Sequence, residues 1–94
     1  MISVTVHYRN ILRQRAGMDH ENLELPNGVD VSIAVRRLAG RHGPGLAEML
    51  LSPAGEVSHH LVIFVNRQRV LPGQHSVSLA GGDEIVLFPT ISGG

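Results

Sequence analysis

The segment GDEIVLFPTISGG, residues 82–94, closes the chain and carries the pattern that decides the fold. Gly81, Gly82 and Asp83 have the composition of a tight turn. The following residues, Glu84–Phe88, are predicted to form a strand with Ile85 and Leu87 on one face and Val86 and Phe88 on the other. Pro89 ends this strand, since proline cannot donate to a ladder of hydrogen bonds. Residues 90–94 are left beyond the last strand.

The beginning of the chain also has strand periodicity. Residues 2–8 alternate apolar and polar side chains, which predicts a half-buried strand. Leu23 and Leu25 alternate with polar neighbours in the same way. We therefore expect these two strands to form a hairpin whose long connection, residues 10–19, is anchored by Ile11 and Leu12.

A third strand is predicted at Leu61–Val65, which is a continuous run of apolar residues. Such a run is typical of a strand buried on both faces at the centre of a sheet. The polar residues 66–69 are expected to turn the chain into a short strand at Val70 and Leu71, which Pro72 and Gly73 end.

Between the hairpin and the third strand the apolar period changes to that of a helix. The residues at positions i, i+3, i+4 and i+7 that share one helical face are Val31, Ala34, Val35 and Leu38. Asp30 is the expected N-cap, and Gly40 or Gly43 with Pro44 is expected to end the helix. A shorter second helix is predicted around Leu46, Met49 and Leu50.

The apolar stripe of the first helix needs a sheet face to cover it, so the predicted fold class is α+β. We expect a mixed sheet of four to five strands wrapped on one main helix, with a short second helix beside it. The side chains expected to cover the helix are Ile2, Val4, Val6, Ile63, Val65, Ile85 and Leu87. Residues 1–89 are predicted to form one domain and residues 90–94 a flexible tail.

Composition excludes several classes of function. The chain has 94 residues, 43% of them hydrophobic, and its acidic and basic residues balance, so neither nucleic acid nor a membrane is an expected partner. It contains no Cys and no Lys, which excludes a thiolate nucleophile, a Walker A loop and Schiff-base chemistry. The six His residues are scattered, so no metal site is predicted. The first residues lack the pattern of a signal peptide, and the expected location is cytoplasmic.

The order of the elements, the start of the chain, the Phe64-Val65-Asn66 segment and above all the ending 82–94 resemble the MoaD/ThiS family of sulfur carriers. The resemblance covers essentially the whole chain and implies a β-grasp, ubiquitin-like fold. The Phe88-Pro89 pair before the tail is more similar to MoaD, the small subunit of molybdopterin synthase, than to the shorter ThiS proteins. The longer stretch 46–60 and the segments 11–13 and 51–53 are also similar to carriers that serve cysteine synthesis, so both pathways stay open.

The resemblance implies a carrier without catalytic side chains of its own. An E1-like adenylating enzyme of the MoeB/ThiF type would use ATP to activate the carboxylate of Gly94, next to Gly93, and a sulfur donor would leave a thiocarboxylate. No cofactor would be bound permanently. The acceptor would be a molybdopterin-synthase large subunit or a cysteine-synthase-like enzyme, with thiamine or tRNA thiolation as further alternatives. A ubiquitin-like modifier or binding module without sulfur transfer is the alternative of another class.

The resemblance also implies that exposed apolar residues on one sheet face dock the partner enzymes. Phe88 is the first candidate, although a place in the core is equally open for it. Tyr8 and Leu71 come next, and for both of these a core position is favoured. The other candidates for partner binding are Pro89, Ile91, Arg67 and Arg69. For the two arginines, a position in a solvated turn is the favoured interpretation.

Overall fold

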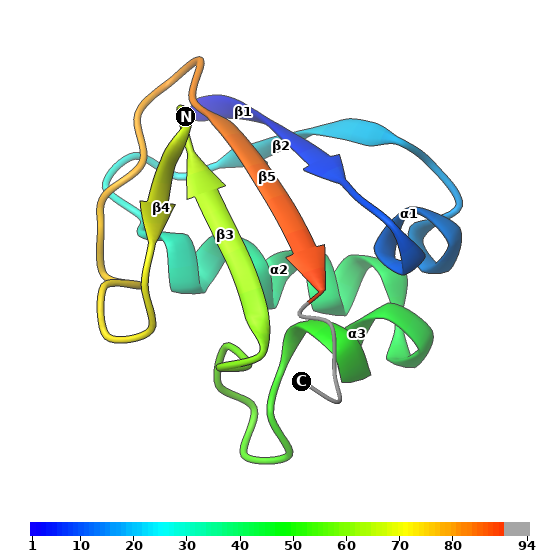
Figure 1. The fold of residues 1–94 in the computed structure, drawn as a ribbon. Helices are drawn as coiled ribbons and strands as arrows, with labels where there is room; N and C mark the ends of the chain where they lie inside the picture. The colour runs from blue at the N-terminus through cyan, green and yellow to red at the C-terminus, as the bar shows by residue number, and fades with distance from the viewer. Residues whose placement is uncertain (90–94) are drawn as a thin grey trace.

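The computed structural model describes residues 1–89, which form one five-stranded sheet with three helices. The elements are β1 (Ile2–Tyr8), α1 (Ile11–Ala16), β2 (His20–Leu25), α2 (Val31–His42), α3 (Pro44–Leu50), β3 (Leu61–Val65), β4 (Gln68–Val70) and β5 (Glu84–Pro89). The strand order across the sheet is β2-β1-β5-β3-β4. Figure 1 shows the sheet lying over α2 and α3, which leaves its other face open.

The sheet is mixed, as predicted. β1 and β2 form the expected antiparallel hairpin, and β3 is antiparallel to both β4 and β5. β5 returns to lie parallel to β1, so the first and last strands of the domain are neighbours. This pairing puts β5 in the centre of the sheet and corrects the expectation that the strand 61–65 lies there.

The prediction that residues 61–65 are buried on both faces was also wrong. Leu61, Ile63 and Val65 are buried under the helices, while Val62 and Phe64 are only half-buried on the open face. The helices cover one side of the sheet only, so a run of apolar residues here supplies both a core face and an apolar surface.

The core forms where the apolar face of α2 meets the covered face of the sheet. All four residues of the predicted stripe have exposed fractions of 0%. Asp30 caps α2 as predicted, since its Oδ1 accepts a hydrogen bond from Ile33 N at 2.9 Å. The helix ends at Gly43, whose φ of 86° favours glycine and whose N–H donates to Ala39 O. None of the helices within residues 1–89 is long and apolar enough to cross a membrane.

The connection between β1 and β2 contains a helix that the sequence did not predict. α1 has six residues, which is too short for a helical period to be recognised. Leu12 is completely buried, and Gly17 ends the helix with φ 76°. Leu12 and the partly buried Ala16 therefore pack α1 against the core. Ile11, the other expected anchor, is 38% exposed, so that part of the prediction was wrong.

The turn between β3 and β4 is shorter than expected. Only Asn66 and Arg67 lie between the paired residues Val65 and Gln68, and both have positive φ, 51° and 72°. This is the pattern of the two-residue turn whose twist suits an antiparallel hairpin. β4 therefore starts at Gln68, two residues before the predicted strand.

Candidate functional site

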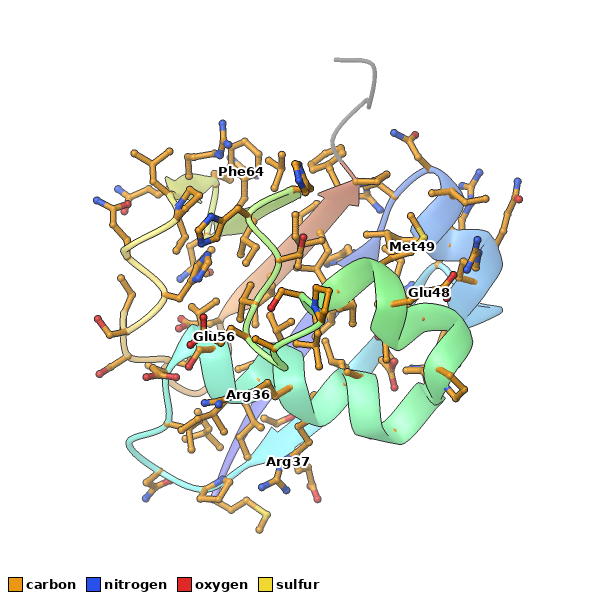
Figure 2. All side chains as sticks on the ribbon, turned by 90° about the horizontal axis from the view of Figure 1, so that it is seen from below. Arg36, Arg37, Glu48, Met49, Glu56 and Phe64 are labelled. Carbon is orange, nitrogen blue, oxygen red and sulfur yellow. The ribbon has the colours of Figure 1, made fainter. Side chains whose placement is uncertain are left out.

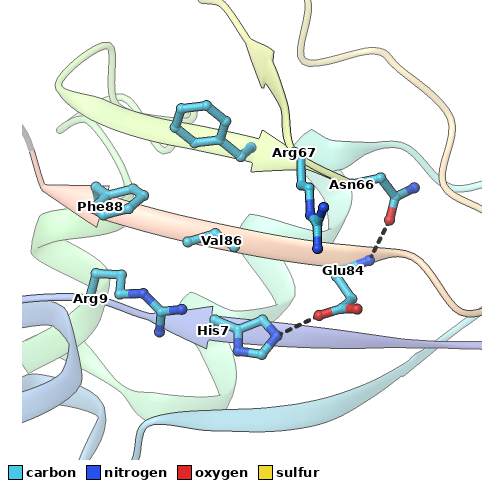
Figure 3. Close-up of a pocket in the computed structure, with 8 residues that line it drawn as sticks. His7, Arg9, Asn66, Arg67, Glu84, Val86 and Phe88 are labelled. Atoms are coloured by element: carbon cyan, nitrogen blue, oxygen red, sulfur yellow. Dashed lines mark hydrogen bonds and ion pairs between the residues drawn. The ribbon is translucent and has the colours of Figure 1, made fainter.

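The open face of the sheet carries a groove of about 580 Å³. Figure 3 shows the side chains that line it, which come from β1 and the residue that follows it, from β3, from β5 and from the β3–β4 turn. They are His7, Arg9, Phe64, Asn66, Arg67, Glu84, Val86 and Phe88. The parallel register, in which His7 pairs with Val86, brings side chains from opposite ends of the chain to one surface.

The floor of the groove is apolar. Phe64 and Phe88 pack edge to face, with ring centroids 5.9 Å apart and an interplanar angle of 75°. Val86 is the cross-strand partner of Phe64, and Phe88 is that of Val62. These four side chains are half-buried, so they retain apolar surface that a second protein can cover.

The β3–β4 turn is tied to the start of β5 by a set of hydrogen bonds. Asn66 Nδ2 donates to Asp83 Oδ1 at 2.8 Å, and Glu84 N donates to Asn66 Oδ1 at 2.9 Å. The backbone adds a bond from Asn66 N to Glu84 O at 2.8 Å. These bonds hold the next residue, Arg67, in a left-handed conformation that costs a non-glycine residue roughly 1 kcal/mol.

The charges around the groove are unequal. Glu84 is its acidic residue, and its Oε1 lies 3.0 Å from Nε2 of His7. Arg9 and Arg67 line the same groove, and within residues 1–89 neither forms an ion pair. The groove therefore presents two guanidinium groups around an apolar floor.

The structure brings only some of the predicted partner-binding residues together. Phe88 and Arg67 line the groove. Pro89 is half-buried at the end of β5, where it pairs with Leu61. Arg69 is exposed and is the cross-strand partner of Phe64, so it lies on the open face beside the groove.

Two of the candidates lie elsewhere. Tyr8 is completely buried on the covered face, so its assignment as a partner-binding residue was wrong and its interpretation as a core residue is confirmed. Leu71 is 46% exposed just after β4, so its interpretation as a core residue was wrong, and it does not line the groove. Ile91, Gly93 and Gly94 lie outside the described residues.

Sequence reasoning did not single out His7, Arg9 or Phe64 as site residues. The alternation of polar residues at the start of the chain placed His7 and Arg9 on the non-core face of the first strand. That signal is not specific, because any half-buried strand has such a face. What makes these residues a site is the parallel pairing of β1 with β5, which alternation does not predict.

A second cluster of titratable side chains is buried between β1, β2 and α2. The Tyr8 hydroxyl donates to Oε2 of Glu21, and Nε2 of His42 bonds the same oxygen. Arg41 Nε lies 3.2 Å from Oε1 of Glu21, whose side chain is only 8% exposed. Burial, with the nearby Glu21 carboxylate, raises the pKa of Tyr8, so it stays a hydrogen-bond donor. Because Tyr8, Glu21 and His42 are almost fully enclosed, we interpret this cluster as one that stabilises the fold.

The Glu21 carboxylate makes the stability of the fold depend on pH. Burial by itself would raise the pKa of Glu21, but the bonds from Tyr8 and His42 and the charge of Arg41 lower it below the ordinary value of 4.5. Its stabilising contribution is therefore complete above pH 4.5 and disappears as the pH falls through the lower, folded-state pKa.

We expect Glu21→Gln to lower the free energy of unfolding by about 1–3 kcal/mol at pH 7, because it weakens a buried, charge-assisted set of bonds. The difference from wild type should shrink as the pH falls below 4.5. Urea unfolding at a series of pH values would measure both effects, with the exposed residue Glu24 replaced by Gln as the control. A difference that stays constant down to pH 2 would contradict this account of Glu21.

The histidines are spread over the molecule. Within the described part of the chain, no three side chains of His, Cys, Asp or Glu are grouped so that they could hold a metal ion. His7 and His20 form one pair on the open face, with ring centroids 5.8 Å apart. His75 lies at the start of α2 beside His59, and burial first, then His59, lowers its pKa.

Comparison with known proteins agrees with this architecture. Residues 6–94 match the model of the ThiS family. The chain is 30% identical over 83 residues to small archaeal modifier protein 1 of Haloferax volcanii, a match that covers 88% of this chain and 91% of the relative.

Solved structures extend the comparison. The crystal structure of the Haloferax volcanii protein superposes with a TM-score of 0.85 at 27% identity, over 98% of this chain and 99% of the other. A protein of Pyrococcus furiosus assigned as molybdopterin converting factor subunit 1 has a TM-score of 0.79 at 27% identity, over 97% of this chain and 100% of the other. The Amycolatopsis orientalis BexX/CysO complex contains a chain that superposes with a TM-score of 0.69 at 25% identity, over 97% of this chain and 99% of the other. The predicted β-grasp fold is thereby confirmed.

Proposed function

The chain belongs to the ThiS family, and on that premise we propose that it is a non-catalytic sulfur carrier that works through the carboxylate of Gly94. In this proposal an E1-like enzyme of the MoeB/ThiF type uses ATP to adenylate Gly94. A sulfur donor then displaces AMP and leaves a C-terminal thiocarboxylate, which gives its sulfur to an acceptor enzyme. The proposal places these steps in the cytoplasm and requires no resident cofactor.

The chemistry explains why activation has to come from outside. A free carboxylate is anionic and resonance-stabilised, so it is a poor electrophile until it becomes a mixed anhydride. The adenylate loses AMP as sulfur attacks, and the resulting thiocarboxylate is a better nucleophile than the carboxylate. Glycines at the end of the chain suit this role, because the absence of Cβ permits close approach in a narrow active site. Five residues can extend by about 17 Å, at ~3.3–3.6 Å per residue.

The observation that supports this function most directly is the position of the groove. Phe88 lines it, and the next residue, Pro89, ends β5 and leads to residues 90–94. A partner that covers the groove therefore lies beside the origin of the C-terminal segment. Docking of the body and insertion of the terminus become parts of one binding event, and Phe88, Pro89, Arg67 and Arg69 are the described residues proposed to take part.

Molybdopterin synthesis is the acceptor pathway that we propose first. The Phe88-Pro89 ending and the 27% identity to the Pyrococcus furiosus protein support it. The large subunit of a molybdopterin synthase would then take the sulfur. Cysteine synthesis remains the alternative, supported by the similarity to the chain in the BexX/CysO complex.

A second candidate function is the modification of other proteins. The similarity to small archaeal modifier protein 1 favours it, since that relative is 30% identical. The same activated Gly94 would then form an amide bond with an amine of the target and release AMP. Because this chain has no Lys, it offers no lysine side chain for linking further copies to itself.

Intact-mass analysis tests the proposal. We expect the full chain, incubated with the E1-like enzyme of its own organism, ATP and a sulfur donor, to exchange one terminal oxygen for one sulfur. Omission of ATP should prevent the exchange. Tandem mass spectrometry should place the sulfur on Gly94. Gly94 found only in amide bonds to partner proteins would support the modifier function instead, and an unchanged mass would refute both.

A further inference from the structure

We propose that the fold protects its activated C-terminus from the chain itself: residues 1–89 present no cysteine, lysine or accessible tyrosine that could displace AMP from Gly94. The inference rests on the proposed function, because only an activated Gly94 needs this protection. It goes further, since it gives a role to the side-chain nucleophiles that the chain lacks or buries. Thiols, amines and phenols are the side chains that form such acyl bonds most readily.

The reaction to be avoided is a single substitution. A neutral amine attacks the carbonyl carbon of the Gly94 adenylate, a C–N bond forms, the bond from that carbon to the oxygen of AMP breaks, and the amine loses one proton to water. The amide is stable, so that copy can no longer accept sulfur. A guanidinium keeps its proton at neutral pH and cannot start the reaction, whereas lysine, with an ordinary pKa of about 10.4, always has a small neutral fraction.

The basic side chains near the end of β5 are arginines. Residues 90–94 can extend by about 17 Å beyond Pro89. Arg9 lies well within this distance, because its N–H donates to Leu87 O at 3.1 Å. Arg13 follows in α1, a helix that contacts β5. A lysine at either position would therefore stand within reach of the activated carboxyl group.

The contacts of these two arginines within residues 1–89 do not require a guanidinium. Arg9 makes one long contact, 3.5 Å from its Nη1 to the carbonyl of Tyr8. Arg13 Nε lies 3.5 Å from Oδ1 of Asp19, and both side chains of this pair are exposed. Each is a contact with one acceptor, which the ammonium of a lysine would serve as a point charge. The lack of a nucleophile, rather than a local hydrogen bond, therefore accounts for arginine here.

The single tyrosine of the chain is a nucleophile that the fold buries. Tyr8 pairs with Leu87, close to the end of β5, but its side chain is completely buried on the covered face. Its hydroxyl donates to Oε2 of Glu21, and burial, followed by that carboxylate, raises the pKa of Tyr8. The phenolate therefore does not form at neutral pH. The tyrosine nearest to the activated terminus is thus as unreactive as the arginines around it.

The parallel pairing of β1 with β5 keeps the start of β1 out of reach as well. Figure 1 shows β1 beginning at the end of the sheet opposite to the tip of β5. Tyr8 pairs with Leu87, so Ile2 lies about 26 Å from Pro89 along the strands, at ~3.3 Å per residue. An amine at this end of β1 is therefore beyond the reach of about 17 Å that residues 90–94 allow.

Arg37 provides a matched position that the terminus cannot reach. It lies on α2 and lines a cavity together with Ser3 and Glu24, near the start of β1. Ser3 is about 23 Å from Pro89 along the strands, at ~3.3 Å per residue. Figure 2 shows Arg37 on the side of the molecule away from the tip of β5. A lysine at this position has the same chemistry as one at Arg9, but lies in the wrong place to be acylated.

The test activates Gly94 chemically, so that no enzyme is needed. The full chain is released from an intein fusion as a thioester and converted to a succinimidyl ester at pH 8. A tethered amine has a millimolar effective concentration, about a thousandfold above a protein concentration of ~1 µM. We therefore expect Arg9→Lys and Arg13→Lys to form an internal amide, which is one water lighter than the free acid, whereas wild type and Arg37→Lys should be hydrolysed.

The yield of amide from Arg9→Lys should exceed that from Arg37→Lys at least tenfold and should not change on dilution, because the reaction is intramolecular. Tandem mass spectrometry should place the bond between Gly94 and the introduced lysine. Thermal unfolding should be the same for all the variants, since each keeps its charge. Equal yields from Arg9→Lys and Arg37→Lys would overturn the inference, and so would an internal ester or amide in wild type at a comparable yield.

A separate measurement keeps this inference distinct from the proposed function. Wild type is incubated with the E1-like enzyme, ATP and a sulfur donor, and its intact mass is followed. A mass that never changes would refute the proposed function. The chemically activated variants would still decide which positions the terminus reaches, because their reaction does not depend on the enzyme. Sulfur loading of wild type together with equal amide yields would instead refute the inference and leave the proposed function standing.

Discussion

Removal of Gly93 and Gly94 is expected to abolish sulfur loading, which is the largest effect that we predict. The shortened chain would end at Ser92, whose carboxylate falls about 7 Å short, at ~3.3–3.6 Å per residue. Ser92 also carries a side chain where the partner's active site is expected to fit close to the backbone. Gly94→Ala should be less severe and should slow loading about a hundredfold, since small misplacements of a reacting group have effects of that order.

These effects would be measured by intact mass after timed incubation with the E1-like enzyme, ATP and a sulfur donor. Ser92→Ala is the matched control, because it changes the same segment but keeps both glycines. Thermal unfolding of all the variants should coincide, since residues 90–94 follow the last strand. A truncated chain that still gained sulfur would refute the role of Gly94.

Leu87→Ala is expected to lower the free energy of unfolding by about 2–5 kcal/mol. Leu87 has an exposed fraction of 0% in the central strand β5, so the substitution leaves a cavity beneath the sheet. Small domains have total stabilities of roughly 5–15 kcal/mol, so this loss is a large part of the whole. Sulfur loading at raised temperature should fall with the folded fraction.

Leu71→Ala is the control for this prediction, and it should change the free energy by less than about 0.5 kcal/mol. The two substitutions remove the same atoms, but Leu71 is 46% exposed. Urea unfolding followed by far-ultraviolet circular dichroism would measure both variants. Equal losses would contradict the assignment of Leu87 to the core and Leu71 to the surface.

The groove and the stability of β5 are linked in this fold. Leu87 faces the core and Phe88 faces the groove, so alternate residues of the same strand form the core and line the groove. A substitution that loosens β5 would therefore disturb the groove and the origin of the C-terminal segment together. Loading assays of core variants should be made well below their melting temperatures, so that docking is measured on folded protein.

Local pattern predicted the elements with the strongest periodicity. The stripe from Val31 to Leu38, the cap at Asp30 and the alternation in β1 and β5 all appear as expected. The pattern failed where one tertiary contact decides the structure. α1 depends on the burial of Leu12, and the position of β4 depends on the tight turn at Asn66 and Arg67.

By itself, the sequence determined the type and order of most elements and most of the residues that face the core, because burial requires apolar side chains at the period of each element. It also contained the ending from which we infer the function. Only the tertiary structure decided that β5 lies parallel to β1, and this pairing brings His7 and Arg9 beside Val86 and Phe88. Such contacts join residues far apart in the chain, and no local period records them. The groove is therefore a property of the folded sheet.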